Sequence, residues 1–144
     1  MTKRTKTVMV FGTFDILHLG HIHMFEKARQ YGDKLVAVVA RDINVEKVKG
    51  VGPFNSERER LKFVKHIDLV DGAVLGDKTD VYKVIKKIKP EVIALGYDQK
   101  NYVDKLGHAL IALGLNKTKI VRLTECQPNR MKTTKIKKYI ERMI

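Results

Sequence analysis

The sequence predicts a doubly wound α/β domain with a parallel sheet of about five strands. Short runs of β-branched and apolar residues recur along the chain with few polar interruptions, which is typical of strands covered on both faces. Segments with helical spacing separate these runs, and such alternation favours parallel strands joined by right-handed crossovers. The 144 residues contain no internal repeat or linker, so we expect residues 1–144 to form a single domain.

The predicted strands share a high content of Val, Ile, Leu and Ala, and each is only four to seven residues long. In chain order they are residues 7–11, 34–40, 72–75, 91–95 and 119–123.

The predicted helices lie between these strands and after the last one. The segment 21–31 places Ile22, Phe25 and Ala28 at helical spacing, and the segment 56–67 opens with the capping-box pair Ser56 and Glu59. The remaining predicted helices are residues 80–88, 101–113 and 132–144.

The charge is strongly positive, because 29 Lys and Arg oppose 16 Asp and Glu and leave a net charge of +13. The surplus is concentrated in residues 117–144, which hold nine basic and two acidic residues. A surplus of this size indicates an anionic partner, and composition alone leaves nucleic acid, a membrane surface and a small polyphosphate open.

Composition excludes several classes of protein. With 44% hydrophobic residues, 10 Gly and 3 Pro, the chain is neither disordered nor collagen-like. No apolar run approaches the roughly 20 residues of a membrane helix, and no signal peptide is predicted. The one cysteine, Cys126, fits a reducing compartment, so we expect a cytoplasmic location.

The loop after the first strand carries the most chemistry. It reads G-T-F-D-I-L-H-L-G-H over residues 12–21. Gly12 would allow the backbone to approach a ligand closely. His18 and His21 flank Gly20 at the start of a predicted helix. Two imidazoles beside the free N–H groups of a helix N-terminus suit a polyphosphate. A metal site with His23 as a third nitrogen is the alternative, but it would not need the glycine. Asp15 is predicted to orient this loop by accepting from backbone N–H groups.

The paired motifs at 12–15 and 18–21 resemble those of the cytidylyltransferase-like nucleotidyltransferases, a family with a Rossmann-like fold. The resemblance extends to residues 32–36, 40–42 and 94–99 and so covers nearly the whole chain. It places Lys47 and Lys49 in a basic loop and Arg60 at a helix arginine of the family.

One stretch departs from the cytidylyltransferase pattern. Those enzymes carry Arg-Thr-x-Gly-Ile-Ser-Thr-Thr before the last helix, whereas residues 127–134 here read Q-P-N-R-M-K-T-T and keep only Thr133 and Thr134. This stretch and the loop 96–99 are more similar to the archaeal FAD synthases, which transfer AMP from ATP to FMN. A CTP-dependent glycerol-3-phosphate cytidylyltransferase is the alternative enzyme.

The resemblance implies roles for individual residues. The predicted catalytic set, which would stabilise the charge of the transferring phosphate, is His18, His21, Lys47 and Arg60, with Lys49 beside them. The predicted nucleotide-binding set is Thr13, Phe14, His18, Leu19, Gly20, His21, Asp98, Thr133 and Thr134. Within it, Thr13 and Phe14 would supply loop contacts, Asp98 would read the ribose or base, and Thr133 and Thr134 would donate to the pyrophosphate. Apolar contact with the flavin is predicted from Phe14, Tyr97, Tyr102 and Met131.

The resemblance also implies ATP and FMN as substrates and a divalent cation of the magnesium type. The cation would be bound mainly through substrate phosphates, because no cluster of ligand residues appears in the sequence. No metal-ligating residue, nucleic acid or membrane partner is therefore predicted, and a homodimer is left open. A basic nucleic-acid-binding protein is the competing non-enzyme class, but aromatic residues make up only 7% of the chain and form no stacking platform.

Overall fold

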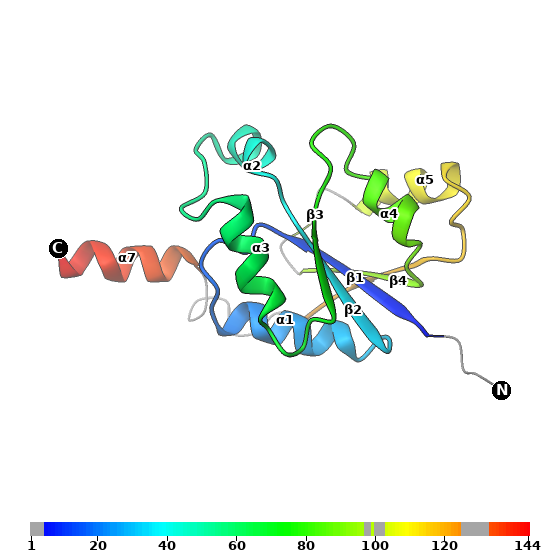
Figure 1. Cartoon of the computed structure of the whole chain (residues 1–144), viewed down its shortest axis with the longest axis horizontal. Helices are drawn as coiled ribbons and strands as arrows, with labels where there is room; N and C mark the ends of the chain where they lie inside the picture. The colour runs from blue at the N-terminus through cyan, green and yellow to red at the C-terminus, as the bar shows by residue number, and fades with distance from the viewer. Residues whose placement is uncertain (1–4, 97–98, 100–102, 125–132) are drawn as a thin grey trace.

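The computed structural model describes residues 5–96, 99, 103–124 and 133–144 (Figure 1). In chain order its elements are β1 (Thr7–Gly12), α1 (Leu19–Arg29), β2 (Lys34–Val39), α2 (Asp42–Lys49), α3 (Glu57–Lys65), β3 (Gly72–Leu75), α4 (Lys83–Ile88), β4 (Val92–Leu95), α5 (Val103–Ala112), β5 (Lys119–Arg122) and α7 (Thr133–Met143).

All five strands belong to one parallel sheet with the order β3-β2-β1-β4-β5, which confirms the predicted fold class. The central strand β1 pairs on both sides, so that Val10 lies opposite Ala37 of β2 and Ala94 of β4. The strand order reverses between β1 and β4. In open sheets of this type, ligands bind in the crevice beyond the carboxyl ends of the strands at such a reversal.

Helices cover both faces of the sheet and create two cores. On one face, Val8 and Val10 of β1 pack with Phe25 and Ala28 of α1 and with Val64 of α3. On the other face, Met9 of β1 packs in a second core with residues of β4, α4 and α5. These residues include Ile93 of β4, Ile85 of α4, and Leu106 and Leu110 of α5. Alternate residues of β1 thus serve opposite cores, which explains why the strand reads as an unbroken apolar run.

Helix α2 was not predicted, because its residues were interpreted as a basic loop. It is short and contributes only Val45 to the core. The β-branched residues Ile43, Val45 and Val48 weaken its helical propensity, which hid it from sequence analysis. The helix is held instead by Asp42 in its first turn and by Gly50, whose φ of 81° closes its C-terminus.

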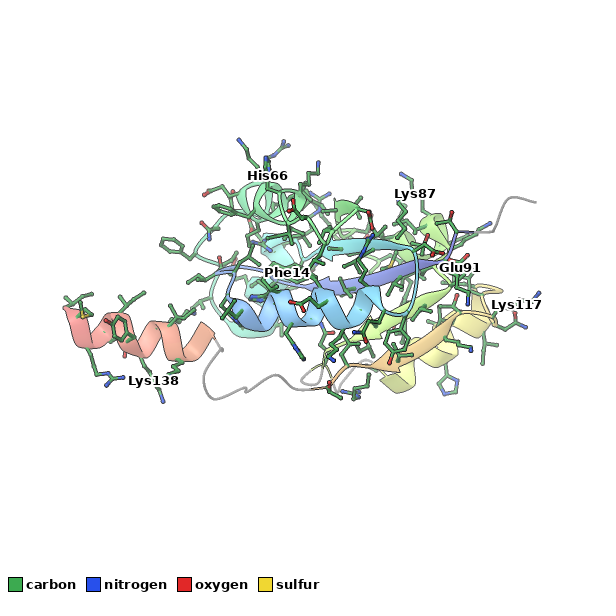
Figure 2. The ribbon with its side chains drawn as sticks, turned by 90° about the horizontal axis from the view of Figure 1, so that it is seen from below. Phe14, His66, Lys87, Glu91, Lys117 and Lys138 are labelled. Atoms are coloured by element: carbon green, nitrogen blue, oxygen red, sulfur yellow. The ribbon has the colours of Figure 1, made fainter. Side chains whose placement is uncertain are left out.

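Helix α7 extends away from the sheet and carries Lys138 on its surface (Figures 1 and 2). It has a basic side and an apolar side, and the apolar residues Tyr139, Ile140 and Met143 are all exposed. No helix among the described residues is long and apolar enough to cross a membrane.

Candidate active site

The loop from β1 to α1 is shaped by a buried aromatic ring. Phe14, labelled in Figure 2, comes from this loop. It is 2% exposed, has a φ of 53° and packs against Phe25 of α1. A Cβ atom on Gly12 would lie 2.7 Å from Cζ of this ring. The close approach predicted at Gly12 is therefore made by Phe14 itself, and burial corrects the prediction that the Phe14 ring contacts a flavin.

Asp15 orients the loop as predicted. Its carboxylate accepts hydrogen bonds from the backbone N–H groups of Phe54, at 2.7 Å, and of Asn55, at 2.8 Å. The Asn55 amide Nδ2 also donates to the Asp15 carbonyl at 2.6 Å. These three bonds tie the loop after β1 to the segment that precedes α3.

His18 and His21 form a reciprocal cap at the start of α1. Nδ1 of His18 accepts from the Gly20 N–H at 3.0 Å, and Nδ1 of His21 accepts from the His18 N–H at 3.2 Å. Their ring centroids are 4.1 Å apart. Because each Nδ1 is an acceptor, the proton of each neutral ring is on Nε2.

The surroundings keep both rings neutral near pH 7. Burial lowers the pKa of His18 below its ordinary value. Burial, and then the charges of His18 and Lys49, lower the pKa of His21 to about 4. The pair therefore presents two neutral Nε2–H donors, and positive charge must come from other residues.

This pKa shift predicts a pH dependence of folding. Between about pH 6.5 and pH 4 the unfolded chain protonates His21 while the folded chain does not, so stability should fall as the pH is lowered through this window. The shift of His18 has the same sign. Urea unfolding across this range should show a shallower decline for His21→Asn than for the wild type, and equal declines would contradict the assignment.

Lys47 and Lys49 lie in the last turn of α2, where both are exposed. Since Lys49 contributes to the lowered pKa of His21, this end of α2 lies near the histidine pair. The role predicted for Lys47 and Lys49 at the substrate phosphates stays a prediction, and both lysines lie on a helix instead of the predicted loop.

Arg60 of α3 is wholly buried. Its guanidinium donates from Nε to the Asn55 carbonyl at 3.0 Å, from Nη1 to the Thr13 carbonyl at 2.7 Å and from Nη2 to Asp42 Oδ1 at 2.6 Å. This geometry does not support the predicted contact of Arg60 with substrate phosphates. The arginine instead joins three segments around the loop through its bonds to Thr13, Asn55 and Asp42.

A second set of bonds fixes the start of α2. Glu57 accepts from the Asp42 N–H at 3.1 Å through Oε1 and from Arg41 Nη1 at 2.6 Å through Oε2. The hydrogen bonds from Arg41 and the Asp42 N–H help lower the pKa of Glu57, despite opposing burial. This role of Glu57 was not predicted from the sequence. An acidic residue in the first turn of a helix is common and does not indicate a contact with a distant segment.

Gln99 joins the carboxyl ends of β1 and β4, where the strand order reverses. Its Nε2 donates to the Phe11 carbonyl at 2.8 Å, and its Oε1 accepts from the Gly96 N–H at 2.8 Å. The side chain thus anchors the loop after β4 to the strand that leads into the histidine motif.

Several predicted residues lie outside the described residues, namely Tyr97, Asp98, Tyr102, Cys126 and Met131. Thr133 begins α7 and is followed by Thr134, so both lie in the first turn of the closing helix as predicted. Leu19 is 65% exposed at the start of α1. Across the described ranges, no three His, Cys, Asp or Glu residues gather into a potential metal site.

Comparison with known proteins shows the family of this chain. The family model described as cytidylyltransferase-like matches residues 9–139. The chain is 40% identical to the FAD synthase of Thermoplasma acidophilum over 95% of both chains, and 46% identical to that of Methanothrix thermoacetophila over 84% of this chain and 82% of the relative.

Solved structures share the fold. A lipopolysaccharide core biosynthesis protein from Thermoplasma volcanium superposes with a TM-score of 0.80 at 40% identity, over 86% of this chain and all of that one. A pantoate-beta-alanine ligase from Francisella tularensis, at 18% identity, shares the fold with a TM-score of 0.62 over 95% of this chain and 69% of its own. The chain belongs to the cytidylyltransferase-like family.

Proposed function

We propose that this protein is an FMN adenylyltransferase, an FAD synthase that transfers AMP from ATP to FMN and releases pyrophosphate. The observation that carries the proposal is the reciprocal pair of neutral histidines, at the end of β1 where the strand order reverses. The names of relatives about 40% identical over nearly the whole chain supply the substrates.

The reaction requires no covalent intermediate on the protein. An oxygen of the FMN phosphate attacks the α-phosphorus of ATP, the bond from that phosphorus to the bridging oxygen breaks, and pyrophosphate leaves with the bonding electrons. A phosphate monoester is largely ionised at pH 7, so the nucleophile needs no general base. Catalysis then rests on positioning and on stabilising negative charge.

The residues divide this work between them. Nε2–H of His18 and of His21 would donate to the α-phosphate oxygens, where charge changes in the transition state. Lys47 and Lys49 would neutralise the triphosphate, and the first turn of α1, with Leu19 and Gly20, would offer backbone N–H groups. Arg60 would hold Thr13 and the loop in place.

The base and pyrophosphate contacts rest on residues predicted from the sequence. Asp98 would read the ribose or base, supported by Gln99, which anchors this loop to β1. Thr133 and Thr134 would donate to the pyrophosphate from the first turn of α7.

A divalent cation of the magnesium type would shield the phosphates of ATP. The carboxylates around the loop are poor candidates for direct ligands of this cation. Asp15 already accepts hydrogen bonds from two backbone N–H groups, and Asp42 accepts one from Arg60. An ion held by substrate phosphates and water fits this donor set, since magnesium commonly keeps several waters.

Substrate choice is the direct test of the proposal. We expect FAD to form from ATP and FMN, with kcat/KM for ATP at least about 10-fold above that for CTP, because an unpaired polar group in a base pocket is costly. Chromatography would separate FAD from flavin cytidine dinucleotide, and EDTA should abolish either product until magnesium is restored. Rapid CDP-glycerol formation from CTP and glycerol 3-phosphate without any flavin dinucleotide would instead identify a cytidylyltransferase.

A further inference from the structure

Phe54 is the most exposed aromatic side chain among the described residues, at 84%. It follows Val48, which is 76% exposed in the last turn of α2, and Val51, which is 67% exposed in the segment between α2 and α3. Three large apolar side chains in seven residues all face solvent. Single exposed apolar residues are ordinary, but a group of them on one short segment indicates a binding surface.

The backbone of Phe54 is held firmly although its ring is free. Its N–H donates to Asp15 at 2.7 Å, and the following residue, Asn55, is bonded to both Asp15 and Arg60. Pro53 precedes it and has a restricted φ of its own. An anchored backbone with an exposed ring is an arrangement that presents the ring at a defined place.

That place is next to the proposed reaction centre. Asp15, the partner of Phe54, is three residues before His18, so their Cα atoms are at most about 11 Å apart. The charge of Lys49, the last residue of α2, also helps to lower the pKa of His21. The hydrogen bond to Asp15 holds the backbone of Phe54 beside the loop that carries the histidine pair.

We propose that Phe54 is a specificity-determining residue that stacks on the isoalloxazine ring of the acceptor. This inference rests on the proposed function and names a contact for its second substrate. When the FMN phosphate lies at the histidines, the ribityl chain places the flat apolar ring some distance away, at the rim of the site. Stacking of an aromatic side chain on a flat heterocycle would also remove Phe54 from water. Phe14, which the sequence suggested for this contact, is buried.

If Phe54 stacks on the flavin ring, removing its side chain should lower kcat/KM only for an acceptor that has this ring. We expect Phe54→Ala to lower kcat/KM for FMN about 10-fold, mainly through KM, while leaving KM for ATP unchanged. With ribitol 5-phosphate, which has the phosphate and the polyol chain but no ring, the variant and the wild type should react equally. Phe54→Trp should retain FMN activity, because it restores an aromatic face.

Phe63 provides a matched control. It is a phenylalanine 54% exposed near the other end of α3, and Phe63→Ala should leave both acceptors unaffected. Thermal unfolding of Phe54→Ala should match the wild type, since the ring is in solvent. Equal kcat/KM for FMN in Phe54→Ala and wild type, or an equal loss with both acceptors, would overturn the proposed contact.

Equilibrium binding separates this inference from the proposed function. Quenching of FMN fluorescence should report wild-type binding and a weaker affinity for Phe54→Ala. If FMN binds in this way but no FAD forms, the contact stands and the proposed function fails. If FAD forms and Phe54→Ala binds FMN as well as the wild type, the function stands and the contact fails. Absence of FMN binding to the wild type would overturn both.

Discussion

Replacing His18 or His21 by alanine is expected to lower the turnover of FMN and ATP by about two to three orders of magnitude, the usual cost of removing one charge-stabilising donor. The physical reason is the neutral Nε2–H that each ring presents, fixed by the acceptor role of its Nδ1. Single-turnover measurement of FAD formation with saturating substrates would isolate this effect from binding.

The helix cap must be separated from catalysis, because His18 also stabilises the first turn of α1. Asn is a strong N-cap residue, so His18→Asn should keep this turn while losing the Nε2–H donor. We expect it to unfold at the wild-type temperature and to be as inactive as His18→Ala. Near-normal turnover in His18→Asn would remove the imidazole from the mechanism and leave only a structural cap.

Replacing Arg60 by alanine is expected to destabilise the fold by about 3 kcal/mol, because it removes a buried charged partner and leaves carbonyl groups without their donors. The carbonyls concerned belong to Thr13 and Asn55. For a domain of this size such a loss corresponds to a fall in Tm on the order of 10 °C. Calorimetry would measure it directly.

Two further variants show whether Arg60 acts only through structure. Arg60→Lys keeps the charge but cannot provide the planar fork that reaches three acceptors, so it should also lower Tm. Arg41→Ala breaks a pair with Glu57 that is partly exposed and should cost less. An unchanged Tm together with complete loss of activity in Arg60→Ala would contradict the positioning role and favour direct contact with substrate.

Many features of this protein could be predicted from the sequence, because they depend on residues that are close together along the chain. The apolar strands are continuous since both faces are covered, and their alternation with helices allowed the fold class and all five strands to be predicted. The histidine motif and its place after β1 were equally readable. Asp15 was predicted to bind backbone N–H groups because turn aspartates commonly do so.

Other features depend on contacts between segments far apart in the chain. Helix α2 has a weak helical propensity, so its residues were interpreted as a loop. Its two ends and the hydrogen bond from the Asp42 N–H to Glu57 stabilise it in the fold. Phe14 and Phe54 are the same residue type in two loops, and only packing decides that one is buried against Gly12 and the other exposed.

Arg60 illustrates the same limit for charged residues. A sequence shows its charge and its position in a helix, and these suggested contact with phosphate. Whether the guanidinium faces a ligand or three protein acceptors depends on where Thr13, Asn55 and Asp42 lie in space. Local patterns in the chain were therefore enough to predict the fold class and the position of the histidine motif after β1. The side chains that contact this loop could be identified only in the folded molecule, because burial and hydrogen-bond partners come from segments that lie far apart in the sequence.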